Sequence, residues 1–191
     1  MGFLLTSEAV SYAWIVLVVF WFVSAWRVKR TAEAEPRAAR LVHIVTMVLA
    51  YLLLFDLNLR LGVLNQRFLP ISPAATATGV LFTWAGIAFA IWARVHIGQY
   101  WSARVTLKED HKLISTGPYK YVRHPIYTGL LAATVGTAFA IGRWQGLIGA
   151  TIILFAHILK ARKEERLMTS HFGAAYEDYR LHTGFLIPRF Y

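Results

Sequence analysis

The 191-residue chain contains no cysteine. This absence excludes a disulfide framework, a thiolate nucleophile and any cysteine-based metal site. The seven histidines do not compensate for it, because they form no His-x-x-x-His or Glu-x-x-His pair on an expected helix. We therefore expect no metal site.

Two further kinds of motif are missing. The chain has no Gly-x-Gly-x-x-Gly sequence and no P-loop, so a nucleotide-like cofactor would not be held by the usual strand–loop–helix unit. Ser115 and Ser170 lack the Gly-x-Ser-x-Gly context of a hydrolase nucleophile. A catalytic site in this chain must use a different architecture.

Charge is scarce, and long apolar segments take its place. Only 16% of the residues are charged and 57% are hydrophobic, which is too apolar for an ordinary soluble domain. The segments free of charge are 9–26, 41–55, 68–93, 125–142 and 144–159. Crossing a bilayer requires at least about 17 residues, and the second and fifth segments are shorter than this. The second reaches the length only if its helix continues to Leu64, and the fifth only if it includes its basic flank. We expect an all-α integral membrane protein with about five transmembrane helices.

Basic residues outnumber acidic ones, 20 against 10, and they are unevenly spread. Seventeen of the 20 lie in residues 27–40, 94–123 and 160–191. This alternation between successive loops follows the positive-inside rule and places the N-terminus outside and the C-terminus in the cytoplasm. The net charge of +10 then reflects contact with anionic membrane lipids, and we expect no nucleic-acid partner. Because no Lys or Arg precedes the first apolar segment, we expect no cleaved secretory signal.

The most informative segment runs from Gly117 to Gly129 and combines aromatic residues, cations and turn-forming Gly and Pro. His124 precedes Pro125, so we expect an extended residue followed by the first position of a helix. The N-terminus of that helix would face the cytoplasm as an anion site, with donors added by Arg123 and His124. The alternative is that these polar residues only anchor an ordinary helix at the interface.

A second polar segment, residues 157–173, is where the fifth helix leaves the membrane. His157, Lys160 and Glu164 follow helical spacing and therefore share one face. Gly173 is the expected end of the helix. The alternative is an amphipathic exit helix whose charges form salt bridges in solvent.

Glu164 and Glu165 are adjacent, so we expect one to turn inward and the other to pair with Arg162 or Lys163 in solvent. The fourth and fifth segments are separated by a short turn and should form a hairpin. Glu164 should then come close to residues 124–127. An anion site beside a carboxylate suits a zwitterion, such as the amino-acid portion of a cofactor.

Three sequence motifs in the C-terminal half carry a family resemblance. They are His111-Lys112-Leu113-Ile114 with Gly117-Pro118-Tyr119, Arg123-His124-Pro125-Ile126-Tyr127-Thr128-Gly129, and Glu164-Glu165-Arg166-Leu167 followed by Phe172-Gly173 and Tyr176. Together they resemble the isoprenylcysteine carboxyl methyltransferase family, to which phospholipid N-methyltransferases are related. The resemblance covers about residues 94–189.

The resemblance implies a membrane methyltransferase that uses S-adenosyl-L-methionine and forms one domain over residues 1–191. Residues 1–93 would form three membrane helices, and residues 94–191 the cofactor-binding catalytic half. The cytoplasmic cofactor pocket would be formed by segment 94–125, the hairpin of the fourth and fifth helices and the C-terminal helix. The cofactor-binding residues carried over are His111, Lys112, Leu113, Ile114, Tyr119, His124, Pro125, Ile126, Tyr127 and Glu164. Arg123 and Lys160 would contact the acceptor as catalytic residues.

The reaction implied is methyl transfer to the carboxylate of a lipophilic acceptor, either a small molecule or a prenylated peptide ending in isoprenylcysteine. Eukaryotic family members have an Arg at the position of Lys160, so this chain keeps the cation but loses the bidentate fork. Three alternatives stay open: methylation of an amine headgroup, a sterol-reductase relative that binds a nicotinamide dinucleotide, and a non-catalytic protein that keeps the cofactor pocket. The identity of the acceptor and the oligomeric state also stay open.

Overall fold

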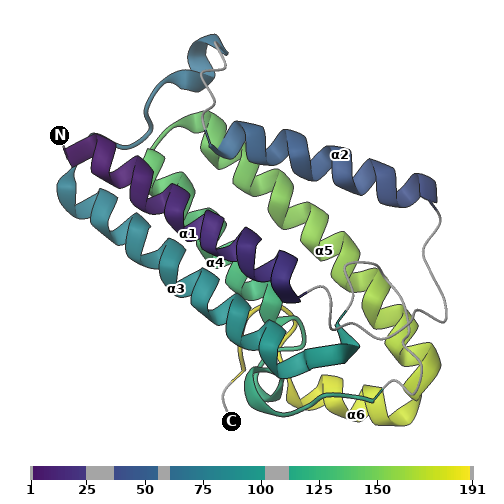
Figure 1. Ribbon diagram of the computed structural model, residues 1–191. Coiled ribbons are helices and arrows are strands. Elements are labelled where there is room, and N and C mark those ends of the chain that lie inside the picture. Colours follow the sequence, from purple (N-terminus) through teal and green to yellow (C-terminus); the bar gives the residue numbers. More distant parts are fainter. Residues whose placement is uncertain (1, 25–36, 56–60, 102–111, 190–191) are drawn as a thin grey trace.

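The computed structural model describes residues 2–24, 37–55, 61–101 and 112–189 (Figure 1). Within these ranges the chain is helical, and β-type pairing is limited to two isolated bridges. The helices are α1 (Gly2–Ser24), α2 (Arg37–Leu54), α3 (Pro73–Ile97), α4 (Pro125–Ile141), α5 (Trp144–Phe172) and α6 (Ala174–His182), with 3₁₀ helices η2 (Gly62–Asn65), η3 (Gly98–Tyr100) and η4 (Gly117–Lys120). This content agrees with the predicted all-α fold.

Helices α1 to α5 correspond to the five apolar segments of the sequence. Among the described residues, Pro73–Tyr100 and Trp144–Phe172 are long and apolar enough to cross a membrane. The apolar parts of the other three, Glu8–Ser24, Ala38–Leu54 and Pro125–Ile141, are shorter. That all five helices cross the bilayer stays a prediction.

The second helix does not extend beyond its charge-free segment. It ends at Leu54, so the expected continuation to Leu64 is wrong. The chain instead forms a 3₁₀ turn that begins at Gly62, whose φ of +58° lies outside the right-handed helical region. Asp56 and Arg60, which would lie on the continued helix, are outside the described residues.

Helices α3 and α4 pack with their backbones in contact. Gly79 and Gly86 of α3 face Gly136 and Gly129 of α4, and a Cβ added to Gly129 would lie 2.6 Å from the backbone nitrogen of Ala90. Small residues at such positions allow membrane helices to approach this closely. The contact fixes the first turns of α4 against the last turns of α3.

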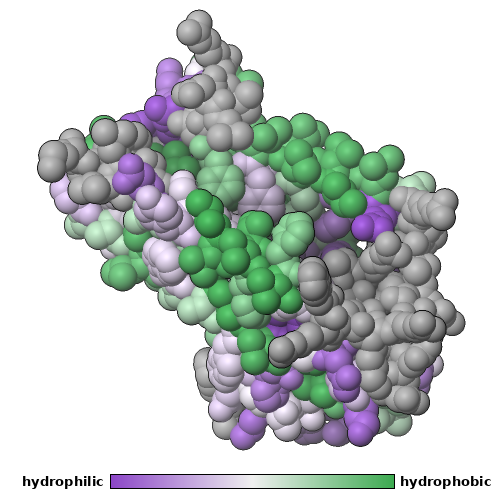
Figure 2. All heavy atoms as spheres, viewed as in Figure 1, coloured by the Kyte–Doolittle hydropathy of each residue, from purple (hydrophilic) through white to green (hydrophobic). Residues whose placement is uncertain are grey.

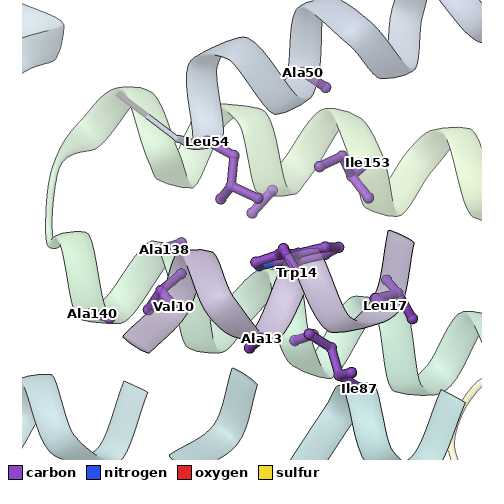
Figure 3. Packing of buried hydrophobic residues seen from close by; sticks show 12 residues of the cluster. Val10, Ala13, Trp14, Leu17, Ala50, Leu54, Ile87, Ala138, Ala140 and Ile153 are labelled. Carbon is purple, nitrogen blue, oxygen red and sulfur yellow. The ribbon is translucent and has the colours of Figure 1, made fainter. Parts of the chain in front are cut away.

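Helix α1 contributes Trp14 to the centre of the core (Figure 3). The indole N–H donates to Thr137 Oγ1 of α4 over 2.9 Å, and the ring meets Tyr51 and Phe55 edge-on. A buried indole N–H needs such a partner, so the bond also fixes the orientation of the ring. One core thereby joins α1, α2 and α4.

Helix α2 touches α5 near one end and then diverges from it (Figure 1). The contact is at Gly149 of α5, where an added Cβ would lie 2.9 Å from the backbone nitrogen of Leu54. Figure 2 shows apolar residues along α2 and hydrophilic residues gathered at the end of the molecule that carries α6. Large apolar side chains such as Leu81 and Phe155 are exposed on the outer faces of the helices, which suits contact with lipid.

Helices α4 and α5 form the predicted hairpin. Gly142 ends α4 in the left-handed conformation, with φ +69°, and α5 begins at Trp144. The start of α4 and the last turns of α5 therefore lie at the same end of the bundle. Helix α5 ends at Gly173, as predicted, and α6 turns back beneath this end (Figure 1).

Candidate functional site

The segment before α4 is shaped by a tight turn and a 3₁₀ helix. Gly117 has φ +58°, and a Cβ at this position would collide with the ring of His96. Glycine is therefore required here. The His96 ring is fixed by a hydrogen bond of 2.9 Å between its Nε2 and Thr116 Oγ1.

The C-terminal segment after α6 is hydrogen-bonded to the residues around the start of α4. The backbone N–H of Arg123 donates to the carbonyl of Gly184 over 2.8 Å, and the N–H of Gly184 donates to the carbonyl of Tyr121 over 3.1 Å. On the first turn of α4, Thr128 Oγ1 donates to the carbonyl of Leu186 over 2.8 Å. These bonds hold the residues around the helix start in a defined position.

His124 is the last residue before α4, and its side chain, 9% exposed, lies between two carboxylates. Its Nδ1 is 3.6 Å from Glu164 Oε2, and its Nε2 is 3.4 Å from Glu165 Oε1. The ring also stacks on Tyr127, with 5.7 Å between centroids. Burial alone lowers the pKa of His124, but the two carboxylates outweigh it and raise that pKa above its ordinary value. The site therefore favours the protonated ring.

Both glutamates face this cluster, which corrects one expectation. Glu165 does not pair in solvent with Arg162 or Lys163, because its carboxylate accepts a hydrogen bond from Arg123 Nε and its side chain is only 13% exposed. Adjacent helical positions are about 100° apart, since a turn holds 3.6 residues. The His124 ring fills the space between the two carboxylates and lets both turn toward the same group.

Arg123, predicted to contact the acceptor, is held by protein groups. Besides Glu165, its guanidinium donates to the backbone carbonyls of Arg180, over 3.2 Å, and Thr183. The side chain lines the pocket described below and ties the entrance of α4 to α5 and to the end of α6. Its contact with an acceptor stays a prediction.

Tyr127 connects a carboxylate and a cation. Its hydroxyl donates to Glu164 Oε1 over 2.6 Å, and Lys160 Nζ lies 5.7 Å from the centroid of its ring. The ring of His157 meets the same tyrosine edge-on at 4.9 Å between centroids. His157 is fixed by a hydrogen bond of 2.8 Å between its Nδ1 and the carbonyl of Ile153. A carboxylate and a cation one turn apart on α5 thus both approach this tyrosine, one at its hydroxyl and the other at its ring.

A pocket opens between η3, residues 112–127, the last turns of α5 and α6. The predicted site residues that line it are Lys112, Leu113, Ile114, Tyr119, Arg123, His124, Ile126, Tyr127 and Glu164. Of the remaining predicted residues, Pro125 is buried at the first position of α4, Lys160 lies beside Tyr127, and His111 is outside the described residues. The prediction missed seven lining residues: Ile97, Tyr100, Trp101, Leu167, Met168, Tyr176 and Tyr179.

The missed residues are largely aromatic. Tyr176 and Tyr179 come from α6, and the hydroxyl of Tyr179 donates to the carbonyl of Tyr119 over 2.7 Å. Burial raises the pKa of all three tyrosines, so their hydroxyls stay neutral. The i, i+3 spacing of the two tyrosines in a short amphipathic helix is the signal that could have identified them.

A second cavity, which we call the α2–α5 groove, lies where those two helices diverge. It has a volume of about 470 Å³ and is lined by His43, Ile44, Met47, Val48, Tyr51 and Leu52 of α2, by Phe55 directly after it and by Lys160 of α5. Lys160 therefore borders this groove and also approaches Tyr127, which lines the first pocket. Lys160 and Tyr127 therefore separate the α2–α5 groove from the first pocket.

Comparison with known proteins finds relatives of the C-terminal half. Residues 79–170 match the family model described as the isoprenylcysteine carboxyl methyltransferase (ICMT) family. The protein-S-isoprenylcysteine O-methyltransferase of Schizosaccharomyces pombe is 35% identical over 91 residues, which cover 46% of this chain and 39% of that protein. Methanethiol S-methyltransferase 2 of Bradyrhizobium diazoefficiens is 40% identical over 75 residues, covering 38% of this chain and 27% of that protein. The chain thus matches less than half the length of each of these two relatives.

A solved structure shares the fold. The eukaryotic intramembrane Ras methyltransferase ICMT superposes with a TM-score of 0.52 at 20% sequence identity, over 81% of this chain and 53% of that chain. The family match and the shared fold indicate an integral membrane protein. The region matched by the family model contains the start of α4 and both glutamates of α5.

Proposed function

Because residues 79–170 match the model of the isoprenylcysteine carboxyl methyltransferase family, we propose that the chain transfers a methyl group from S-adenosyl-L-methionine to the carboxylate of a lipophilic acceptor. The acceptor class is that in the name of the S. pombe relative, an isoprenylcysteine at a protein C-terminus. The observation that carries the proposal is the position of Tyr127, whose hydroxyl binds Glu164 while its ring faces Lys160. A site for the cofactor at Glu164 and a site for an anionic acceptor at Lys160 would then meet at Tyr127.

The groups around the pocket suit S-adenosyl-L-methionine. Glu164 would accept hydrogen bonds from its ammonium group or ribose hydroxyls. Helix α4 begins without a side-chain cap, so its positive dipole end would bind the carboxylate of the cofactor. The rings of Tyr119 and Tyr127 would face the sulfonium. The remaining predicted contacts are His111, Lys112, Leu113, Ile114, His124, Pro125 and Ile126.

When bound, this cofactor supplies a methyl group on a positively charged sulfur, open to attack by a nucleophile. A C-terminal carboxylate has a pKa of about 3.5 and is ionised at neutral pH, so the chain needs no general base for this acceptor. Lys160 would orient the carboxylate. Arg123 is already bound to Glu165 and would act mainly by positioning the α4 entrance, although it lines the same pocket.

The pocket lining favours a reaction that neutralises its charged reactants. Tyr119, Tyr176 and Tyr179 are buried and present neutral aromatic surface, so little water would reach the acceptor carboxylate. Excluding water and fixing the orientation of the carboxylate are the contributions this chain makes to the rate.

The pocket would face the cytoplasm, with the N-terminus outside. The support is the charge pattern, since 17 of the 20 basic residues lie in segments on the proposed cytoplasmic side. A water-soluble methyl donor would enter from that side, and the tail of the acceptor would stay in the lipid.

The acceptor class can be tested directly. Purified protein is incubated with methyl-labelled S-adenosyl-L-methionine and a panel of prenylcysteine, fatty acid, thiol and aminolipid acceptors. We expect a labelled methyl ester that alkali hydrolyses. Labelling of the amine or thiol compounds alone would contradict carboxylate methylation, and cofactor binding without labelling of any acceptor would indicate a non-catalytic protein.

The cofactor site can be tested at Glu164. We expect Glu164→Ala to weaken S-adenosyl-L-methionine binding at least about a hundredfold, because a buried charged partner contributes several kcal/mol. Calorimetry measures the affinity, and thermal unfolding checks that the protein is folded. Glu177→Ala is the matched control, since Glu177 is exposed on α6 and pairs with Arg180. Equal affinities for both variants would exclude Glu164 from the cofactor site.

A thiol is a second candidate acceptor, favoured by the 40% identity to a bacterial methanethiol S-methyltransferase. A thiol with a pKa of about 8.5 must lose a proton before it attacks, whereas a carboxylate is already ionised. The rate with a thiol should therefore rise between pH 6 and pH 8.5, and the rate with a carboxylate should not. Two pH–rate profiles distinguish these reactions.

A further inference from the structure

The α2–α5 groove has the character of a site for an amphiphile with an acidic head. Among the described residues that line it, Lys160 is the one Lys, Arg, Asp or Glu, and most of the others are apolar. Ile44 and Val48 are 44% and 53% exposed, so the groove is open along its side to the surrounding lipid. Its volume of about 470 Å³ is in the range of small-molecule sites.

The groove has a defined length. His43, Met47 and Tyr51 are spaced four residues apart and share one face of α2, and Phe55 follows at the same spacing directly after the helix. From His43 to Phe55 the helix rises about 18 Å, which is more than half of a bilayer core of about 30 Å. The groove is therefore long enough for one extended hydrocarbon chain.

Lys160 lies at the end of the groove that is near the first pocket. Helices α2 and α5 touch where Gly149 meets Leu54, and they diverge from there toward the start of α2. Lys160 is three turns along α5 from that contact, and its Nζ approaches the ring of Tyr127. An acceptor with its carboxylate at Lys160 would have its head at the reaction site and its tail directed toward Phe55.

An aromatic cluster closes the far end of the groove. Tyr51 and Phe55 stack with 6.1 Å between centroids, and Trp14 meets them edge-on at 5.3 and 5.7 Å. Trp14 is itself fixed by its hydrogen bond to Thr137. Residues from three helices thus support this end, and a longer chain could enter only by displacing a packed ring.

We infer that the α2–α5 groove holds the hydrocarbon tail of the acceptor and that Tyr51 and Phe55 set the greatest tail length the protein accepts. The inference rests on the proposed function and adds to it a location and a length limit for the acceptor. A tail longer than the groove must either displace Phe55 or draw its carboxylate away from Lys160. The rate should therefore fall sharply beyond one chain length.

The test uses N-acetyl-S-alkyl-cysteines of increasing chain length with the full chain in lipid nanodiscs. For the wild type we expect kcat/KM to rise with length and then fall about tenfold within a few carbons. Phe55→Ala should move this limit to longer chains. Val48→Trp, at an exposed position midway along the groove, should move it to shorter chains. Phe155→Ala is the matched control, because Phe155 is 60% exposed on α5 and does not line the groove.

The outcomes separate the inference from the proposed function. If the wild type methylates the series but Phe55→Ala and Val48→Trp keep its length profile, the inference is overturned and the proposed function stands. If the wild type binds S-adenosyl-L-methionine but methylates no member of the series, carboxylate methylation itself fails. Thermal unfolding checks each variant, and if Phe55→Ala does not fold, the profile of Val48→Trp decides alone.

Discussion

The α3–α4 and α2–α5 contacts both depend on glycine, yet one is closed and the other opens into a groove. In the first, glycines recur along both helices, as Gly79 with Gly136 and Gly86 with Gly129, so the backbones touch over several turns. In the second, Gly149 permits one close contact, and beyond it the α2 face carries large side chains such as Met47. The repeat of small residues, rather than the presence of one, determines how far two membrane helices stay together.

The two contacts also differ in what they position. The closed α3–α4 pair fixes Gly129 and, with it, the start of α4, where His124 and Tyr127 contact Glu164. The open α2–α5 pair leaves space beside Lys160. A rigid pair therefore supports the polar site, and a divergent pair provides room next to it.

The largest effect is expected from breaking the closed contact. Gly129→Leu places a Cβ 2.6 Å from the backbone of Ala90, so the helices must separate, and we expect a loss of about 3 kcal/mol or more in the free energy of unfolding. Thermal unfolding in detergent measures it. Gly146→Ala is the matched control, since the nearest atom to its Cβ would be 3.6 Å away. If the two variants unfold at the same temperature, the backbone contact is not what holds α3 to α4.

A smaller effect is expected at the open contact, from Lys160→Met. Loss of the cation should lower kcat/KM for a carboxylate acceptor roughly 10- to 100-fold, because a hydrogen bond to a charged group contributes about 1.5–3 kcal/mol. The affinity for S-adenosyl-L-methionine, measured by calorimetry, should not change, and Lys160→Arg should keep most of the activity. A parallel loss of cofactor affinity in Lys160→Met would instead place Lys160 in the cofactor site.

The smallest effect concerns the pH dependence of the site that the closed contact supports. The pKa of His124 is raised in the folded protein above its ordinary value of about 6.5. Its contribution to stability is therefore complete below pH 6.5 and is lost as the pH rises through the higher folded pKa. At pH 5.5 the free energy of unfolding of the wild type should exceed that of His124→Gln by about 1 kcal/mol. The difference should shrink in alkaline solution. Thermal unfolding of both proteins at several pH values measures it, and a difference that grew with pH would contradict the assignment of charge.

Much of the polar site could be predicted from the sequence because its signals are local. Pro125 marks the first position of α4 and Gly173 ends α5, as their backbone preferences indicate. The short α4–α5 turn then requires the two helix ends to meet, and Glu164 does contact Tyr127. Each step depended on neighbouring residues or on a single connection.

The features that could not be predicted depend on contacts between distant segments. Glu165 turns inward because Arg123 and His124 approach from another element, and nothing in the α5 sequence distinguishes its environment from that of a solvent-exposed residue. The α2–α5 groove depends on where two helices diverge, which helical periodicity does not specify. The end of α2 at Leu54 does coincide with the end of its charge-free segment, and the wrong continuation to Leu64 came from the length that a membrane span requires.

The hydrogen bonds between residues 121–128 and 184–186 constrain the order in which the chain can fold. These segments are about sixty residues apart, and α4, α5 and α6 lie between them. These hydrogen bonds cannot form until α4 and α5 have paired and α6 has turned back. Because they close a loop of about sixty residues, they form in the last stages of folding. A nascent chain could have its hydrophobic helices in place and still lack a finished pocket.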